Sequence, residues 1–223
     1  YYMFSDRHRQ KPDPDRRYDR IYIGGDYGQQ NATTFEAFGL DTYRKKFPGL
    51  GEYYHSGRES GRQKSPSEYA RDLVEFMDGL HEQYDNRIFY IFLDPSAKGL
   101  AEEVRRATRT GLDYQVLLRD AENDVALGIS RVQKALVFDI MSISPKQEYA
   151  VQEFGTYEYD KKSIEKGKEV PVKEADHCMD AIRYVVMGAW SKIKHWLPKD
   201  ETPEEIDICD ISSREVREED EYL

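Results

Sequence analysis

The stretch IFYIFLD occupies residues 88–94 and decides the fold class. Its first six residues are apolar or aromatic, so the strand that they predict would be buried on both faces, as is typical of a central strand in a parallel sheet. Asp94 ends the stretch. A carboxylate at that position is costly unless it faces the crevice at the carboxyl end of the sheet, where α/β proteins place their sites. The stretch therefore predicts an α/β domain with a candidate functional residue at Asp94.

A second acidic residue ends a second predicted strand. Residues 21–26 read IYIGGD, and Asp26 closes this run as Asp94 closes the other. A third acid, Asp180, lies in the segment DHCMDAIRY at residues 176–184, which reads as a helix. Carboxylates that converge from separate elements suit hard divalent cations, because such ions prefer oxygen ligands. Two such ions can clamp the attacking and leaving oxygens of a phosphodiester, so the three acids predict a metal-dependent nuclease.

The helix that carries Asp180 is predicted over residues 173–190. At 100° per residue, the apolar side chains gather on one face and Asp180 falls almost opposite them. Asp176 and His177 precede Asp180 by four and three residues, so all three side chains can reach one spot near the positive end of the helix dipole. An acid opposite a core face is most simply a solvated acid, and Asp180 alone would favour that interpretation. Two further acids at strand ends favour a site.

The remaining elements follow in an order that fits a ribonuclease H-like fold. Short links join the first strands into an antiparallel meander, and helices then alternate with strands before the late helix. This order predicts an α/β domain with a mixed central sheet, an antiparallel meander followed by parallel strands, flanked by helices. The other predicted strands span residues 33–40, 52–56 and 114–118, and the other predicted helices begin at Ser65 and span residues 98–110, 123–137 and 144–154.

Composition divides the chain into three parts. Residues 1–18 read as a linker or arm, residues 19–197 as the nuclease domain, and residues 198–223 as an acidic, mobile tail. The chain carries a net charge of −10, yet the tail alone holds 11 acidic and 3 basic residues. The other parts hold 32 acidic and 30 basic residues. The body is therefore nearly neutral, and its charge does not exclude DNA binding through local basic patches.

Membrane and secreted classes are not indicated. The sequence contains no apolar run of about 18 residues, the length that a membrane-spanning helix needs. The two cysteines, Cys178 and Cys209, form neither a CxxC nor a Cys/His metal pattern, which favours a reduced, intracellular setting. Tyr1 is not a start methionine, so we expect the chain to be part of a longer protein or a processed product.

Several motifs together resemble the nuclease domain of phage terminase large subunits. The motif DHxxDAxRY is the most specific of them, and the resemblance covers nearly all of the predicted domain. The segment KGKEVPVK that precedes it is also similar to the family. The motifs are DYG at residues 26–28, DPS at 94–96, NxVxxGI at 123–129, KGKEVPVK at 166–173 and DHxxDAxRY at 176–184.

The resemblance implies a fold and a set of metal ligands. Members of this family have a ribonuclease H-like fold of the resolvase branch and bind two divalent cations, Mg²⁺ or Mn²⁺. By position in the motifs, Asp26 would bridge the two ions, and Asp94 and Asp180 would each complete one metal shell. His177 would serve as a ligand or a proton shuttle, and Asp176 is a further candidate ligand.

The resemblance also implies a biological role. The activity would be endonucleolytic cutting of concatemeric double-stranded viral DNA at the start and end of genome packaging, in a phage packaging complex in the host cell cytoplasm. The implied partners are double-stranded DNA, an ATPase motor domain of the same full-length protein, the portal and the small terminase subunit. The chain contains no GxxxxGK[ST] phosphate loop, so we expect it to cut DNA without translocating it.

A lysine-rich stretch is a candidate for contacts with DNA phosphates. A polar hairpin is predicted over residues 157–172, and acidic residues alternate with its lysines, so a solvated hairpin is an equally good interpretation. The candidate lysines are Lys161, Lys162, Lys166, Lys168 and Lys173.

Two other functions stay open from the sequence alone. The first is a resolvase- or integrase-type nuclease with the same metal chemistry and branched DNA as its target. The second is a catalytically inactive module that docks on DNA or on the portal. The intact acids Asp26, Asp94 and Asp180 argue against the second function.

Overall fold

The computed structural model describes residues 4–28, 31–156 and 176–198 of the chain. Its centre is a mixed six-stranded sheet in the order β5-β4-β1-β2-β3-β6. β2 pairs antiparallel with β1 and β3, β4 lies parallel to β1 and β5, and β6 lies parallel to β3. The predicted meander followed by parallel strands is therefore confirmed. The strands are β1 (Arg20–Tyr27), β2 (Ala32–Leu40), β3 (Phe47–Ser56), β4 (Ile88–Leu93), β5 (Gln115–Asp120) and β6 (Met141–Ser142).

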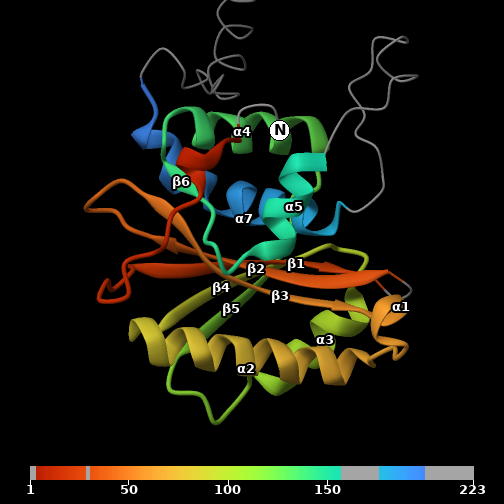
Figure 1. Cartoon of the computed structure of the whole chain (residues 1–223). Coiled ribbons are helices and arrows are strands. Elements are labelled where there is room, and N and C mark those ends of the chain that lie inside the picture. Colours follow the sequence, from red (N-terminus) through yellow and green to blue (C-terminus); the bar gives the residue numbers. More distant parts are fainter. Residues whose placement is uncertain (1–3, 29–30, 157–175, 199–223) are drawn as a thin grey trace, which may run out of the picture.

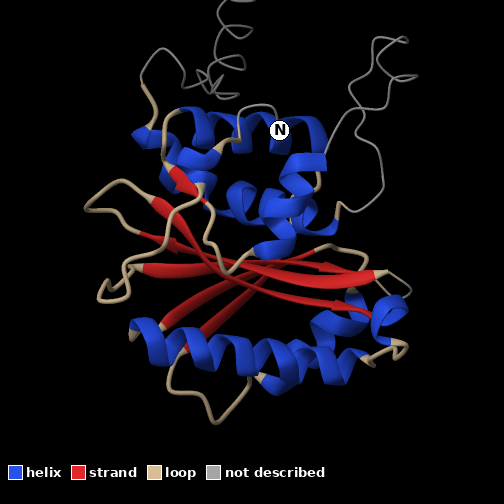
Figure 2. Ribbon diagram, viewed as in Figure 1, coloured by secondary structure: helices blue, strands red, loops and turns tan. Residues whose placement is uncertain are grey.

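Helices cover both faces of the sheet, so the domain has three layers (Figure 1 and Figure 2). One face carries α2 (Pro66–Tyr84) and α3 (Lys98–Ala107), and the other carries α4 (Val125–Val137), α5 (Glu148–Thr156) and α7 (His177–Ile193). A separate hydrophobic core fills each of the two interfaces. The shorter elements are η1 (Asp6–His8), α1 (Gly57–Ser60) and η2 (Lys194–Trp196).

The alternation of side chains along β1 and β4 determines which residues face α7. Ile21 packs in the core under α2, whereas its neighbour Tyr22 packs in the core under α7. Successive side chains of a strand point to opposite faces of the sheet. Asp26, four residues after Tyr22, therefore lies on the α7 side at the carboxyl end of β1. By the same alternation, Asp94, two residues after Phe92, lies on the α7 side directly after β4.

Helix α7 crosses β1 at Gly24, where the two backbones touch. A Cβ atom at Gly24 would lie 2.0 Å from the carbonyl oxygen of Ala181 and 2.8 Å from Val185 Cγ2. Any side chain at this position would hold the helix away from the strand. The missing side chain thus allows α7 to lie directly on β1, with its first turn beside the carboxyl end of the strand.

Two boundaries on the β3 side of the sheet differ from the prediction. β3 begins at Phe47 rather than at residue 52, because its first residues pair with β6, a strand that the sequence does not reveal. The helix predicted from residue 144 begins at Glu148. Gln147 explains the later start, since its side-chain Oε1 accepts the backbone N–H of Ser144 at 2.8 Å and closes a turn there.

The last helix begins at His177, and Asp176 occupies its N-cap position. Residues 157–175 and 199–223 lie outside the described residues, together with the predicted hairpin and all of the tail except Pro198. Asp176 therefore precedes the first helical residue instead of lying within the first turns. The angle that a helical wheel assigns to its side chain does not apply.

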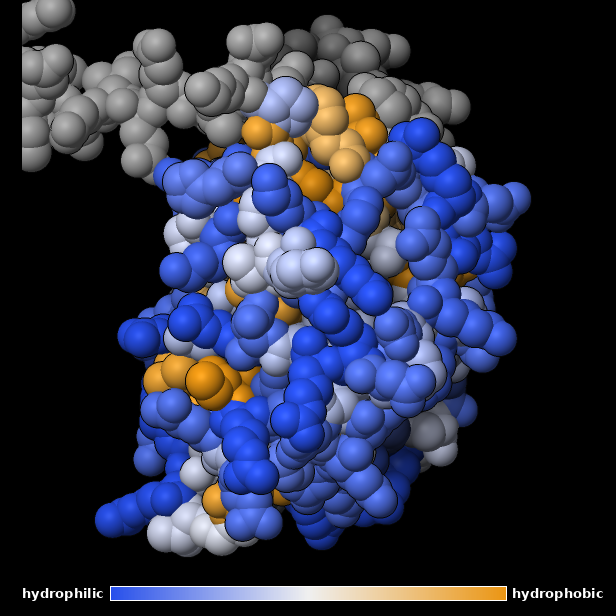
Figure 3. All heavy atoms as spheres, turned by 90° about the vertical axis from the view of Figure 1, so that its left-hand side faces the viewer, coloured by the Kyte–Doolittle hydropathy of each residue, from blue (hydrophilic) through white to orange (hydrophobic). Residues whose placement is uncertain are grey.

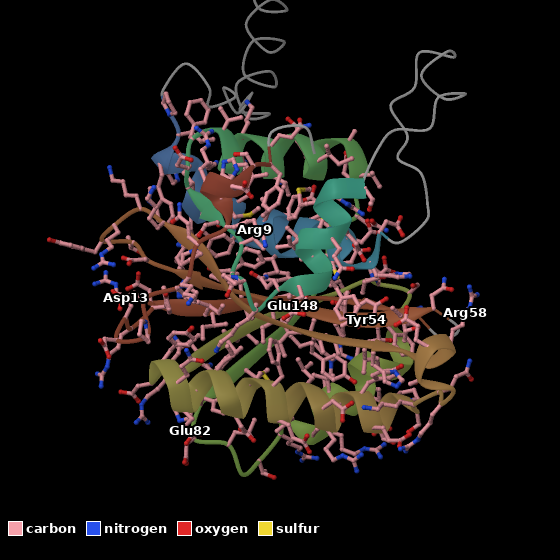
Figure 4. The ribbon with its side chains drawn as sticks, in the orientation of Figure 1. Arg9, Asp13, Tyr54, Arg58, Glu82 and Glu148 are labelled. Carbon is pink, nitrogen blue, oxygen red and sulfur yellow. The ribbon has the colours of Figure 1, made fainter. Side chains whose placement is uncertain are left out.

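The predicted arm packs against the body over its described part, residues 4–18. Arg9, labelled in Figure 4, forms a parallel bridge with Ile143 next to β6. Arg16 donates hydrogen bonds of 2.7 and 2.6 Å to the two carboxylate oxygens of Asp41. Bidentate pairing between a guanidinium and a carboxylate fixes both the position and the orientation of the two groups. This pair and the bridge at Arg9 attach the segment to the body before the chain enters β1.

The side of the molecule in Figure 3 is mainly hydrophilic, with small hydrophobic patches that are separated from one another. Scattered patches of this kind are normal for a protein surface and do not by themselves mark an interface. Within the described residues, no helix is long and apolar enough to cross a membrane.

Candidate active site

Three aspartates from three separate elements surround Tyr184 of α7. Asp26 lies near the end of β1, Asp94 follows β4 directly, and Asp180 lies in the first turn of α7. Burial raises the pKa of Tyr184, and the negative charges of all three aspartates raise it further. The side chains of Asp26 and Asp180 are 19% and 27% exposed, so solvent reaches them. The structure thus gathers the three acids that the sequence predicts to form a site.

His177 is bonded directly to Asp26. Its ring Nδ1 lies 2.7 Å from Oδ2 of the carboxylate. This hydrogen bond raises the pKa of His177, although burial of the ring acts in the opposite direction. Asp176 makes no side-chain capping bond at the N-cap, and its negative charge also raises the pKa values of His177 and Asp180. Of the two predicted accessory residues, His177 is the one that contacts Asp26.

Asp94 is held by three donors from three directions. The backbone N–H of Ser96 donates to Oδ1 at 2.7 Å, and the Tyr184 hydroxyl and the Asn123 amide donate to Oδ2 at 3.0 and 3.1 Å. Burial alone would raise the pKa of Asp94, but the hydrogen bonds from Ser96 and Tyr184 outweigh burial and hold that pKa below its usual value. Asn123 and Tyr184 had no assigned role in the sequence, although both lie in motifs that resemble the family.

Asp180 is held by Arg183 of the following turn. Arg183 donates to Oδ1 of Asp180 from Nη2 at 2.6 Å and from Nε at 3.3 Å, and Arg183 itself is buried. Burial raises the pKa of Asp180 against the effect of Arg183, and the charges of Asp26 and Asp176 raise it further. A cation among these acids would relieve the repulsion between them.

The donor set fits a pair of hard cations. In the described part of the chain, Asp26 Oδ1 and Asp180 Oδ2 make no hydrogen bond, so each acid has an oxygen available for a ligand. Within the same residues, the ligand atoms of Asp26, Asp94 and Asp180 do not all lie within 4.8 Å of one another, as the ligands of one ion would. Two ions about 4 Å apart would hold their outer ligands farther from each other than one ion does.

A second cluster of possible ligand side chains lies at the start of α7, with Glu36 and Cys178 buried and Glu52 half-buried. Among the described residues, Glu36, Glu52 and Cys178 are the one set of three whose possible ligand atoms lie within 4.8 Å of one another. Gln147 donates to Glu36 at 2.8 Å, and two backbone N–H groups in the first turn of α5 donate to Glu52 at 2.8 and 3.1 Å. These bonds give the carboxyl groups structural partners. The sequence analysis missed this cluster, whose signal is a glutamate inside the apolar run of residues 32–40.

Glu153 of α5 holds the start of α7. Its Oε2 accepts the backbone N–H groups of Cys178 and Met179 at 2.8 and 3.1 Å. The first N–H groups of a helix have no partner within the helix, and a carboxylate there also complements the helix dipole. The turn that carries His177 and Asp180 is therefore fixed by a residue from another helix.

The buried carboxyl of Glu153 predicts an unusual dependence of stability on pH. Burial raises the pKa of Glu153 from 4.5 to about 7. Because the folded state then binds a proton that the unfolded state releases, stability falls as pH rises from about 4.5 to about 7, by on the order of 3 kcal/mol. Burial shifts the pKa values of Glu36 and Glu52 in the same direction. Denaturant unfolding between pH 5 and pH 8, with chelator present, measures the fall.

The variant Glu153→Gln isolates this effect, since it keeps the shape of the side chain and removes the titrating proton. We expect a flatter stability profile for Glu153→Gln, and an unchanged profile for Glu148→Gln, which alters an exposed glutamate on the same helix. Parallel profiles for Glu153→Gln and the parent chain would contradict the assignment.

The lysines predicted to contact DNA lie outside the described residues. Their contact with phosphates stays a prediction. They are Lys161, Lys162, Lys166, Lys168 and Lys173.

Comparison with known proteins gives matches among solved structures. No family model and no curated protein matches the chain. The large terminase of the thermophilic bacteriophage D6E is 33% identical, with 83% of this chain and 43% of that chain covered and a TM-score of 0.71. The P22 large terminase nuclease domain is 18% identical, with coverage of 81% and 87% and a TM-score of 0.57. The human cytomegalovirus terminase nuclease domain, soaked with Mn, is 13% identical, with coverage of 81% and 86% and a TM-score of 0.55.

The resemblance to phage large terminases is confirmed. The chain has the ribonuclease H-like fold of the terminase nuclease domains, as the order of its elements predicts. It spans less than half the length of the D6E large terminase, 43% of that chain, and most of the length of the two isolated terminase nuclease domains.

Proposed function

We propose that this chain is a Mg²⁺- or Mn²⁺-dependent endonuclease that cuts concatemeric double-stranded viral DNA during genome packaging. The decisive observation is that Asp26, Asp94 and Asp180 meet on one face of the sheet, at the carboxyl ends of two parallel strands. The similarity to the D6E large terminase supports a role in packaging. The Mn soak of the cytomegalovirus domain, which shares the fold, is consistent with a divalent ion.

Each acid has a distinct role in the proposed mechanism. Asp26 would be shared by the two cations, and Asp94 and Asp180 would each hold one of them. When bound, the ions polarise the scissile phosphate and activate a water molecule for attack. The hydrogen bonds from Ser96 and Tyr184 favour the ionised form of Asp94, the form that a metal ligand must have. Arg183 orients Asp180 and offsets part of the effect that burial has on its pKa.

His177 positions Asp26 and carries a proton. The hydrogen bond from Nδ1 fixes the Asp26 carboxylate that would hold the ions, and the raised pKa of His177 favours the charged ring. A charged imidazolium near neutral pH is a suitable general acid for the leaving oxygen. The other ring nitrogen, Nε2, makes no hydrogen bond within the described part of the chain, so it is the donor in this scheme.

The partners of the proposed nuclease follow from the same role. We propose double-stranded DNA as substrate, an ATPase motor domain in the same full-length protein, and the portal and small terminase subunit as assembly partners. The site of action is the packaging complex in the host cell cytoplasm. The D6E large terminase, of which this chain matches 43%, supports the expectation of a further domain.

Plasmid cleavage under controlled metal tests the proposal. We expect nicking and linearisation of plasmid DNA with Mn²⁺ or Mg²⁺, and none in excess chelator. Ca²⁺ should bind without supporting turnover, because its looser shell positions a nucleophile poorly. Robust cleavage in excess chelator would contradict a metal mechanism. Faster cutting of four-way junctions than of linear duplex would favour the resolvase-type alternative, and metal binding without any cleavage would favour the docking module.

A further inference from the structure

We infer, building on the proposed nuclease function, that a groove beside α7 binds the phosphate backbone of DNA that extends from the candidate active site. The groove has a volume of about 470 Å³ and opens between α7 and the edge strand β5. Its residues come from β1, β4, β5 and the second half of α7. They include Arg20, Tyr90, Phe92, Arg119, Ser191 and Lys192.

The floor of the groove leads to the candidate active site. Tyr90, Phe92 and Asp94 are alternate residues of one extended segment, so their side chains share the α7 face of the sheet. Arg119 of β5 lies next to Phe92 in the sheet register. Four residues of strand span about 13 Å. DNA with a scissile phosphate near Asp94 would therefore reach Arg119 first and the Tyr90 end of the groove next.

The charge of the groove suits a polyanion. Three cations, Arg20, Arg119 and Lys192, face one acid, Asp120, in a chain whose net charge is −10. Arg119 and Lys192 are exposed, and neither forms an ion pair with any residue that the structure describes. The Arg20 guanidinium lies 5.5 Å from the centre of the Tyr90 ring, which supports it at the floor. Two cations are thus available to phosphates, and a third is already positioned.

The aromatic floor favours backbone contact over base recognition. The Tyr22 ring stacks on Tyr90 with centres 5.2 Å apart, and on Phe92 with centres 6.1 Å apart. Rings that pack on one another in a core contribute to stability instead of offering a platform for bases. Contacts to phosphates position DNA without reading its sequence, so the groove should bind DNA of any sequence. An acidic protein segment would also suit the charge, but continuity with Asp94 favours DNA.

Salt-dependent DNA binding by paired variants tests the groove. The test variant is Arg119→Gln with Lys192→Gln. The matched control, Arg105→Gln with Arg109→Gln, removes the same charge from two exposed positions, one in α3 and one just after it, on the opposite face of the sheet. Affinity for a labelled duplex is measured by fluorescence anisotropy in chelator over a salt series, and thermal melting verifies that each variant folds.

The test variant is expected to bind duplex about tenfold more weakly at low salt, and its plot of log affinity against log salt should be shallower by about 1.8, the value for two lost phosphate contacts. The control should match the parent chain. Equal slopes for the test variant and the parent would overturn the inference, and so would an equal loss in the control. The binding assay contains no metal, so its result does not depend on catalysis. If binding depends on the groove but no cleavage is seen with metal, the proposed function alone would be overturned. Metal-dependent cleavage with wild-type affinity in the test variant would overturn the groove alone.

Discussion

Asp26→Asn is expected to lower the rate of DNA cleavage by about a thousandfold or more, because the proposed shared ligand of two ions would lose its charge. Metal ions supply several kcal/mol of transition-state stabilisation in such reactions, and each 1.4 kcal/mol is about a factor of ten in rate. The fold should survive, since asparagine has the same shape and one like charge near Asp180 disappears. Single-turnover cleavage with saturating Mn²⁺ measures the loss.

The same variant gives a readout that does not depend on cleavage. The hydrogen bond to Asp26 is the main cause of the raised pKa of His177, so Asp26→Asn should lower that pKa in an NMR titration of the histidine ring. Asp113→Asn, an exposed acid before β5, is the matched control and should change neither property. Cleavage at the parent rate by Asp26→Asn would remove Asp26 from the site.

Gly24→Ala is expected to destabilise the domain by about 3 kcal/mol or more and to reduce cleavage with it. The new methyl group would lie 2.0 Å from the carbonyl oxygen of Ala181 and 2.8 Å from Val185 Cγ2. A helix backbone and a β-branched side chain cannot move aside without a shift of α7, and overpacking of this kind costs about 1–3 kcal/mol and occasionally more. A shift of α7 would also carry Asp180 away from Asp26. Denaturant unfolding and cleavage below the melting temperature measure the two effects.

Gly51→Ala is the matched control for this change, since it also adds one methyl group to a strand glycine. Its Cβ would lie 3.7 Å from the Phe76 ring, an ordinary contact. We expect Gly51→Ala to be neutral or stabilising by up to about 1 kcal/mol, because alanine restricts the unfolded chain. Equal stabilities for Gly24→Ala and Gly51→Ala would show that α7 does not depend on the close approach at β1.

Local patterns were sufficient for five of the six strands, all except β6, and for the position of the acids at the strand ends. The continuous apolar run of residues 88–93 predicts burial on both faces, and Phe89 and Phe92 are both buried, in different cores. The same pattern places Asp94 at the carboxyl edge of the sheet. Where a strand ends, and to which face each of its side chains points, depends on neighbouring residues and can be read from the sequence. The metal-binding and catalytic roles of the acids stay predictions.

Contacts between distant segments could not be read from such patterns. Glu36 is fully buried, and Gln147, which donates a hydrogen bond to it, lies 111 residues away in sequence. Glu153 is likewise explained by two N–H groups of α7, 25 and 26 residues later. The periodicity of a sequence shows which face of a helix or strand is apolar. It does not show which polar group of another element packs against that face.

The accessory residue beside Asp180 shows a different limit. A helical wheel that begins at residue 173 places Asp176 nearer in angle to Asp180 than His177. In the structure the helix begins at His177, and Asp176 has the N-cap backbone angles φ −118° and ψ 9°. Element boundaries are the least reliable part of a sequence prediction. Here an error of a few residues reverses the geometric order of two candidate ligands, since His177 contacts Asp26.

If the contact between Gly24 and the carbonyl of Ala181 acts as a pivot, it divides α7 into two arms of very different length. Asp180 lies one residue from this fulcrum and Lys192 eleven residues from it, which at 1.5 Å per residue corresponds to about 1.5 Å and about 16 Å. A sideways displacement of about 2 Å at the Lys192 end would therefore move the Asp180 backbone by only about 0.2 Å. With such a pivot, Asp180 would hardly move when the far end of its own helix is displaced. A load applied there, by DNA or by a neighbouring domain, would leave the spacing of the candidate metal ligands nearly unchanged.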